Sequence, residues 1–284
     1  MRYCPTRLAS ARRPITEQLL EVLASDHPQS TRHLFYRMTD PRLPEPVDKS
    51  DAGYTTVQRL LVKLRRDGTI PYGWISDATR RGYFVETWRS PADALAQTAQ
   101  FYRRSYWATS AAYVEVWVES RSLAGVVQDD CAHFGVPLYP SGGFASLTLA
   151  YEAAENINHA AVGRPVKILY IGDLDPAGVL IDRKIEAELR RHLPEADIEF
   201  RRLGITREQA DLMRLPTNPA KDRRGGFQGD TVEAEAMPAG VLRRILCDAI
   251  EGYIDPHEAA ALEAAEASER DLLLSMAASL GAGR

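Results

Sequence analysis

Two aspartates separated by one residue follow a short apolar run in the stretch Val166-Lys-Ile-Leu-Tyr-Ile-Gly-Asp173-Leu-Asp175-Pro176-Ala-Gly178. The run has the length of a strand and is too short for a typical helix. Pro176 suits the first position of a helix, which places Asp175 at the N-cap. We therefore expect a buried strand that turns into a helix. The two acids lie on that turn, where parallel α/β sheets bind ligands.

A third acid makes a metal site the favoured interpretation of this pair. Residues 113–118 form a second apolar run, which ends at Glu119. Right-handed β-α-β crossovers would bring both strand ends to one edge of a parallel sheet. We expect Glu119, Asp173 and Asp175 to converge there, where a divalent cation would relieve the repulsion between their carboxylates. The alternative is that Asp175 only caps the helix and Asp173 is a solvated loop residue.

The elements needed to position these acids can be read from the same part of the chain. We expect a helix over residues 120–134 that ends at Gly135, a strand over 136–139 and a helix over 146–160. An acidic helix rich in Ala and Glu covers residues 256–280, where it could pack on the sheet or on a partner subunit. These patterns predict an α/β fold with a parallel sheet.

The front of the chain has a different pattern. We expect helices over residues 15–23, 32–38 and 54–67, followed by short strand-like pieces over 69–84, which together suggest a winged helix-turn-helix. On the third helix Arg59, Lys63 and Arg66 repeat on the face opposite the apolar one. This basic stripe is interpreted as a DNA-binding surface, with an ordinary solvated face as the alternative.

Composition and charge restrict the class of protein. The 284 residues, 45% of them hydrophobic, can bury a sizeable core. The three cysteines share no motif spacing, which argues against zinc and for a reducing, cytoplasmic compartment. No run approaches the about 18 apolar residues of a membrane span. The net charge is −4, yet residues 1–110 hold 17 Lys and Arg against 11 Asp and Glu, so the front part is the basic one.

At this point the motifs resemble a known family. Glu119 at a strand end, followed by Asp173-Leu-Asp175-Pro-Ala-Gly178, resembles the Toprim fold of topoisomerases, primases and some nucleases, a Rossmann-like fold with a parallel sheet. The DPxG form is most similar to the A subunit of type IIB topoisomerase (topoisomerase VI) and its meiotic double-strand-break relatives. The segment from Thr231 to Met237, which contains Glu233 and Glu235, resembles the family's Glu-containing stretch late in the Toprim domain.

A second match lies upstream, where Thr31-Arg32-His33-Leu-Phe-Tyr36 is similar to the segment that carries the family's catalytic tyrosine. The resemblance implies that Tyr36 is the nucleophile and that Arg32 assists it. Without the resemblance, Tyr36 reads as an aromatic residue packed in a helical core. His33 departs from the family, which usually has an acid there. A looser match over residues 78–82 suggests Arg80 and Arg81 as further DNA contacts.

The resemblance implies a Mg²⁺-dependent enzyme, with Mn²⁺ as a possible substitute, that cleaves double-stranded DNA through a phosphotyrosyl intermediate. It also implies a homodimer in which the tyrosine of one subunit meets the metal of the other, and a separate ATPase B-like subunit for strand passage. Two alternatives stay open: a Toprim nuclease that uses metal-activated water, and a non-catalytic winged-helix DNA-binding protein. An aspartyl phosphatase is disfavoured because Ala177 stands where that motif has Thr or Val.

The expected architecture therefore has five parts. A basic arm covers residues 1–13, and a winged-helix DNA-binding domain covers 14–90. A connecting helix, residues 91–111, leads to a Toprim metal-binding domain over residues 112–254. The C-terminal helix occupies residues 255–284.

Overall fold

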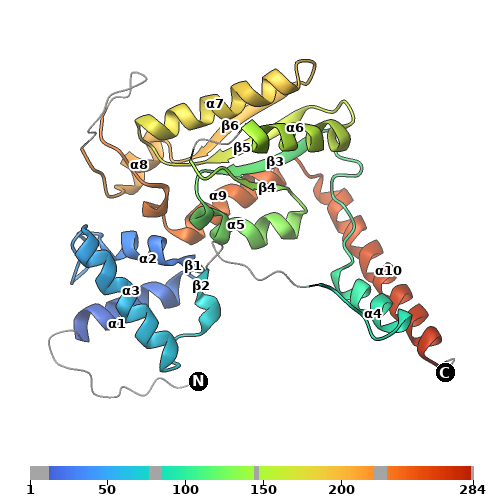
Figure 1. Ribbon diagram of the computed structural model, residues 1–284, viewed down its shortest axis with the longest axis horizontal. Coiled ribbons are helices and arrows are strands. Elements are labelled where there is room, and N and C mark those ends of the chain that lie inside the picture. The colour runs from blue at the N-terminus through green and yellow to red at the C-terminus, as the bar shows by residue number, and fades with distance from the viewer. Residues whose placement is uncertain (1–12, 77–84, 144–146, 220–228, 283–284) are drawn as a thin grey trace.

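The structure is a computed structural model that describes residues 13–76, 85–143, 147–219 and 229–282 (Figure 1). It is a mixed α/β protein with parallel sheets. Among the described residues, no helix combines the length and apolar character that a membrane crossing requires. The predicted arm and the residues 77–84, which include Arg80 and Arg81, lie outside the described residues, so the wing of the expected winged helix stays a prediction.

The front part is a small helical unit with its own apolar core. Its elements are α1 (Arg13–Ser25), β1 (Gln29–Ser30), α2 (Thr31–Met38), α3 (Asp51–Arg66), the 3-10 helix η1 (Tyr72–Trp74) and β2 (Ile75–Ser76). All three predicted helices are present, and Leu19, Leu34 and Val57 from one helix each are fully buried in the shared core. The two short strands pair in parallel.

The second part is built on a four-stranded parallel sheet with the order β4-β3-β5-β6. The chain runs through β3 (Tyr113–Val118), α5 (Arg121–Phe134), β4 (Leu138–Pro140), α6 (Leu147–Ala161), β5 (Val166–Ile171), α7 (Pro176–His192), β6 (Ile198–Gly204), α8 (Arg207–Met213), the 3-10 helix η3 (Ala234–Ala236) and α9 (Ala239–Glu251). The chain turns from β4 back past β3 to β5, so the strand order reverses between β3 and β5.

Helices cover both faces of this sheet, with α6 and α7 on one side and α5 and α9 on the other (Figure 1). Alternation along β3 separates the two cores: Val114, Val116 and Val118 pack with α5 and α9, whereas Tyr113 and Trp117 pack with α6 and α7. Strands buried on both faces are typical of parallel sheets, which explains the continuous apolar runs in the sequence.

Two further helices, α4 (Pro91–Phe101) and α10 (Pro256–Ala282), pack against each other away from the sheet (Figure 1). They run antiparallel, because Ala92 lies near Gly281 while Tyr102 hydrogen-bonds to Glu269. The expected connecting helix ends at Phe101 and packs on α10 rather than only joining two domains. Among the described residues the main partner of α10 is α4, and Glu266 and Glu269 of α10 also pair with the arginines that follow α4.

Candidate functional site

The turns after β3 and β5 meet at the carboxyl edge of the sheet, where the strand order reverses. Val118 pairs with Ile171, and the next residue, Glu119, donates its backbone N–H to the carbonyl of Ile171 at 2.9 Å. The Glu119 carboxylate accepts a hydrogen bond from the backbone N–H of Asp173 at 2.7 Å. In open parallel sheets this reversal point is where ligands bind. The predicted convergence of Glu119 and Asp173 is therefore present in the fold.

Gly172 permits this close approach. A Cβ at this position would lie 2.7 Å from Oε2 of Glu119 and 2.5 Å from the hydroxyl of Tyr170, so no side chain fits without moving the carboxylate. Gly178 has a comparable role one turn into α7, because its Cβ would lie 2.2 Å from the carbonyl oxygen of Asp173. The glycines on both sides of the DxD pair are thus required by space.

Asp175 caps α7, as expected from its place before Pro176. Its carboxylate accepts a hydrogen bond from the backbone N–H of Gly178 at 2.6 Å. This is the N-cap interaction that satisfies an otherwise unpaired amide of the first turn. The interpretation of Asp175 as a helix cap is confirmed, and its role as a metal ligand stays a prediction.

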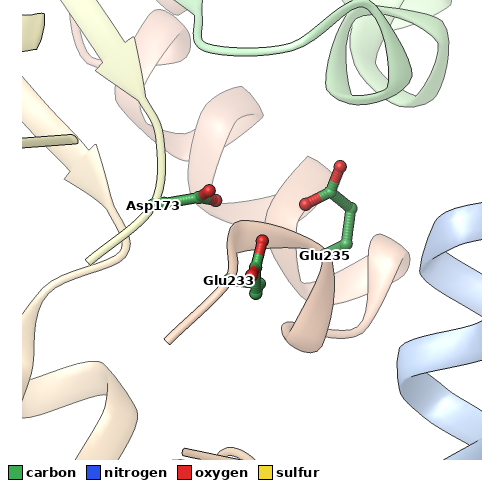
Figure 2. A group of neighbouring side chains, drawn as sticks. All are labelled: Asp173, Glu233 and Glu235. Carbon is green, nitrogen blue, oxygen red and sulfur yellow. The ribbon is translucent and has the colours of Figure 1, made fainter. Parts of the chain in front are cut away.

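A distant segment brings two more acids to Asp173. Leu174 and Val232 form an antiparallel bridge, and the backbone N–H of Ala234 donates to Oδ1 of Asp173 at 2.7 Å. Glu233 and Glu235 flank Ala234 and lie beside Asp173 (Figure 2). Each of the three acids offers one carboxylate oxygen, and these oxygens all lie within 4.8 Å of one another. We call Asp173, Glu233 and Glu235 the acid cluster.

The acid cluster holds negative charge in a poorly solvated place. Burial, followed by the charge of Glu119, raises the pKa of Asp173 to about 9. Burial likewise raises the pKa of Glu119 and of Glu235, which is only 2% exposed. Carboxylates in this position either take up protons or need a nearby cation. Three carboxylate oxygens at this spacing fit a hard divalent cation such as Mg²⁺, which prefers oxygen ligands.

Arg32, on α2, supplies positive charge to one side of the cluster. Its guanidinium lies 2.9 Å from Glu233 and 3.6 Å from Glu235. Burial lowers the pKa of Arg32, but the negative charges of Glu235 and Glu233 have the larger combined effect. The pKa of Arg32 is therefore raised. The Arg32 side chain is half exposed, so solvent weakens both ion pairs. One guanidinium does not balance the charges of three acids.

Tyr36 lies one helical turn after Arg32 and faces the same acids. Tyr36 is only 7% exposed, and Glu233 is the acid whose charge acts most strongly on its hydroxyl. Burial and the charge of Glu233 raise the pKa of the phenol, whereas Arg32 lowers it. The Arg32 guanidinium lies 5.7 Å from the ring centroid of Tyr36 and the Lys49 ammonium 4.9 Å from it. Tyr36 therefore belongs both to the helical core and to the site, within a single chain.

A pocket of about 920 Å³ opens beside Tyr36, between the helical unit and the carboxyl edge of the sheet. One wall comes from α2, α3 and the loop before α3, and the other from the start of α7 and the segments around 218 and 231. Its lining residues are Arg32, Phe35, Tyr36, Lys49, Ser50, Asp51, Tyr54, Asp175, Pro176, Ala177, Leu180, Asn218, Pro219, Thr231 and Glu233. The pocket thus joins residues from the two halves of the protein.

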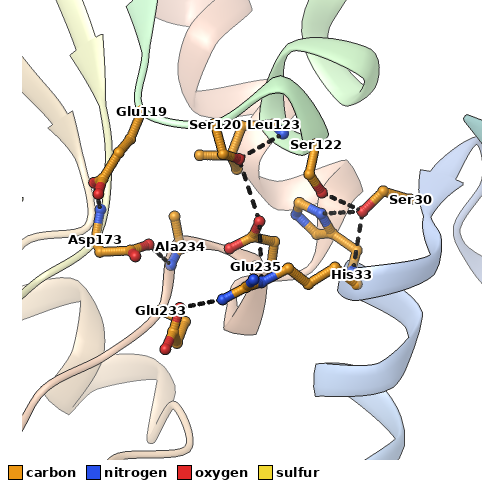
Figure 3. Close-up of polar contacts among 11 residues, drawn as sticks. Ser30, His33, Glu119, Ser120, Ser122, Leu123, Asp173, Glu233, Ala234 and Glu235 are labelled. Atoms are coloured by element: carbon orange, nitrogen blue, oxygen red, sulfur yellow. Dashed lines mark hydrogen bonds and ion pairs between the residues drawn. The ribbon is translucent and has the colours of Figure 1, made fainter. Parts of the chain in front are cut away.

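Polar contacts hold the helical unit against the sheet domain (Figure 3). The hydroxyls of Ser30 and Ser122 lie 2.6 Å apart, and that of Ser30 also lies 3.3 Å from Nδ1 of His33. His33 is fully buried, and burial lowers its pKa to about 3. A neutral histidine rather than an acid therefore occupies this position. Its place beside Ser30 fixes the start of α2, and with it Arg32 and Tyr36, against α5.

The predicted DNA-binding side chains are separate from this pocket. Arg59, Lys63 and Arg66 are all exposed on α3, which confirms the exposed basic face. Whether DNA binds there stays a prediction. Together with the placements above, the structure gathers Arg32, Tyr36, Glu119, Asp173 and Asp175 around one edge of the sheet, while the α3 stripe lies elsewhere.

Sequence reasoning missed the partners of Asp173. Glu233 and Glu235 were quoted only for their resemblance to a family segment and not as metal ligands. The resemblance of this segment was the signal available, because Glu233 precedes the 3-10 helix η3 and Glu235 lies inside it, where strand alternation does not apply. Lys49 was also missed, since an isolated lysine in a loop carries no pattern.

Comparisons with models of protein families, with curated proteins and with solved structures found no match. The function must therefore be argued from the geometry of the site.

Proposed function

We propose that this protein is a divalent-metal-dependent enzyme that cleaves the phosphodiester backbone of DNA with Tyr36 as the nucleophile. One observation carries the proposal: Tyr36 and Glu233, a member of the acid cluster, line the same pocket, which is open to a ligand. A nucleophile, a group able to accept its proton and a set of ligands for a hard cation are thus adjacent. These are the parts that metal-assisted phosphoryl transfer needs.

In the proposed reaction the phenol oxygen of Tyr36 attacks a backbone phosphorus. Its proton passes to Glu233, the bond from phosphorus to the 3′ oxygen breaks, and that oxygen takes a proton from solvent water and leaves as a free 3′ hydroxyl. The DNA stays attached through a 5′-phosphotyrosyl bond. A cation held by Asp173, Glu233 and Glu235 would stabilise the negative charge that develops on the phosphate oxygens. Arg32 keeps Glu233 and Glu235 in place and adds positive charge beside the phosphate.

The size of the pocket bears on how DNA would bind. A volume of about 920 Å³ is within the range of small-molecule sites and holds a short stretch of one strand rather than a duplex. The exposed stripe on α3 would hold flanking duplex by its phosphates without reading the sequence. The substrate we propose is accordingly duplex DNA of which one strand enters the pocket.

The proposed site is complete within one chain. Arg32 contacts Glu233 of its own chain, and Tyr36 lines the same pocket as Glu233, so a partner subunit is not needed to bring the phenol to the acids. A homodimer would serve to make a second nick in the opposite strand. This differs from the arrangement implied by the topoisomerase resemblance, in which the tyrosine meets the metal of the other subunit. A B-like ATPase subunit would be needed only for strand passage.

The test is a covalent adduct between protein and DNA that survives denaturation. Wild-type protein with supercoiled plasmid and Mn²⁺ or Mg²⁺ should give the adduct, and Tyr36→Phe should abolish it. Tyr54→Phe is the matched control, because Tyr54 lines the same pocket without contacting the cluster. Adduct formation by Tyr36→Phe, or its loss in Tyr54→Phe alone, would contradict the assignment.

A mixing experiment tests whether the site lies within one chain. Tyr36→Phe and Asp173→Asn, distinguished by size tags, are each expected to be inactive, and their mixture is expected to stay inactive. An adduct on the Asp173→Asn chain in the mixture would show that its tyrosine uses the acids of the other chain.

Hydrolysis by metal-activated water is the second candidate, and a specific observation favours it. Burial raises the pKa of Tyr36, so the phenol stays protonated and is a weak nucleophile before a cation or substrate binds. In that case Tyr36→Phe would still nick plasmid, no adduct would form, and Asp173→Asn would be inactive. DNA binding with no cleavage under any divalent metal would instead indicate a non-catalytic binding protein.

A further inference from the structure

The ammonium group of Lys49 is buried without a hydrogen-bond acceptor among the described residues. Lys49 lies in the loop before α3 and lines the pocket beside Tyr36. Its Nζ lies over the face of the Tyr36 ring, 4.9 Å from its centroid.

A buried ammonium without acceptors is unfavourable, because it has lost water and gained no replacement hydrogen bonds. Burial accordingly lowers the pKa of Lys49, with Glu233 as the opposing influence. Arg32, on the same wall of the pocket, shows the contrast: its guanidinium contacts both Glu233 and Glu235. The two cations of this wall therefore differ: Arg32 makes two ion pairs, whereas Nζ of Lys49 is near enough to Glu233 to be influenced by its charge but has no hydrogen-bond acceptor among the described residues.

The surroundings of Lys49 favour an anion in the pocket. Ser50 and Asp51, which begin α3, line the pocket next to Lys49, and Pro176 and Ala177, which begin α7, line the opposite wall. The first turns of two helices thus line the same space, each with its N-terminus capped by a side chain, Ser50 for α3 and Asp175 for α7. The flexible four-carbon stem of lysine allows the ammonium to turn from the Tyr36 ring toward a ligand.

We propose that Lys49 binds a backbone phosphate of the DNA strand that occupies the pocket. The proposal rests on the proposed function in that the ligand is the substrate strand. It adds a phosphate contact beside the Tyr36 ring on the wall of the pocket. Lys49 would hold a phosphate there, and this would place the strand across Tyr36 with the attacked phosphate toward Glu233.

The test compares Lys49→Met and Lys49→Arg with wild type for binding of a short fluorescein-labelled single-stranded oligodeoxynucleotide, in EDTA so that no cleavage occurs. Lys49→Met should weaken binding about tenfold, the usual size of one charge-assisted contact. It should also reduce the slope of log affinity against log salt by about 0.7, the value for one phosphate contact on a single strand. Lys49→Arg, which keeps the charge, should retain most of the wild-type affinity and most of the wild-type salt slope.

Thermal unfolding separates this role from a structural one. Because the ammonium is buried without acceptors, Lys49→Met should leave the melting temperature unchanged or raise it while binding falls. Lys167→Met is the matched control, since Lys167 pairs with Glu199 on β6 away from the pocket and should leave oligonucleotide binding unchanged. Equal binding by Lys49→Met and wild type would overturn the proposal, as would a loss of binding that merely follows a lower melting temperature.

Two further arms identify the ligand and separate this proposal from the preceding one. Inorganic phosphate is the second probe: if it stabilises wild type but not Lys49→Met, while both bind the oligonucleotide equally, the site takes free phosphate and the strand proposal is wrong. If wild type binds DNA through Lys49 but never forms the adduct, the cleavage proposal fails and the phosphate contact stands.

Discussion

Two groups of buried carboxylates in the sheet domain are stabilised in different ways. Glu115, in the middle of β3, is fully buried, and its carboxylate accepts hydrogen bonds from the Tyr113 hydroxyl at 2.9 Å and from Nε1 of Trp117 at 3.0 Å. Two donors serve one acid. The acid cluster at the carboxyl edge has three acids close together, with one half-exposed guanidinium between two of them.

The difference indicates which acids have a structural role and which would bind a ligand. Fixed donors of the protein itself surround Glu115, and burial still raises its pKa to about 7. In the acid cluster the donors are one backbone amide to Asp173, the Ser120 hydroxyl to Glu235 and Arg32, which leaves net negative charge uncompensated. A cluster short of positive charge, beside a pocket, is where a cation would add most.

Of the variants considered, Asp173→Asn should change the stabilisation by metal most, because Asp173 is central to the acid cluster. Saturating Mn²⁺ at about 100 times its dissociation constant should stabilise wild type by about 2.7 kcal/mol, and the variant should lose most of this. Without metal the variant should be no less stable than wild type, since it removes one of several mutually repelling charges. Calorimetry with and without Mn²⁺ measures both.

Glu199→Gln is the control for Asp173→Asn, because Glu199 pairs with Lys167 far from the cluster. It should keep the full metal-dependent stabilisation. If Asp173→Asn keeps it as well, the acid cluster is structural and resembles Glu115 after all.

Glu115→Gln should have an intermediate effect that depends on pH. The pKa of Glu115 is raised in the folded state, so the protein is most stable below the unfolded pKa and loses stability as pH rises toward about 7. A neutral amide avoids this loss. The variant should match wild type at pH 4 and exceed it by up to about 3 kcal/mol above pH 8, as judged by chemical unfolding. Metal-dependent stabilisation should not change in Glu115→Gln. A loss of it would contradict the assignment of Glu115 to the fold rather than to the metal site.

Substitutions of Asp175 should have the smallest effect on stability. They test whether Asp175 is a metal ligand in addition to the acid cluster. Asp175→Ala removes the cap of α7 and should cost about 1 kcal/mol of unfolding free energy, whereas Asp175→Asn keeps a good capping side chain and should cost little. Both variants should keep the affinity for Mn²⁺ if Asp175 is only a cap. A large fall in that affinity for Asp175→Asn, measured by titration calorimetry, would add Asp175 to the ligands as the sequence predicts.

Local signals in the sequence predicted the parts of the fold that short-range physics decides. The apolar runs before Glu119 and Asp173 gave two strands, and Pro176 gave the start of α7 with Asp175 as its cap. The parallel pairing that joins these turns also followed, because β-α-β units leave few alternatives.

Long-range contacts account for what sequence reasoning could not supply. The bridge between Leu174 and Val232 decides that Glu233 and Glu235 reach Asp173, and no local pattern encodes such a pairing. The packing of α4 on α10 is likewise a contact between segments far apart in the chain. Tyr36 looked ambiguous in the sequence because it has two roles, a ring in the core and a hydroxyl at the site.

The most direct test of the central claim is a crystal structure of the protein soaked in Mn²⁺, read by anomalous scattering. We predict a peak bound by carboxylate oxygens of Asp173, Glu233 and Glu235 at about 2.1 Å, with Tyr36 of the same chain beside it. No peak at saturating Mn²⁺, or a peak held by Glu119 and Asp175 without Glu233 and Glu235, would contradict the account.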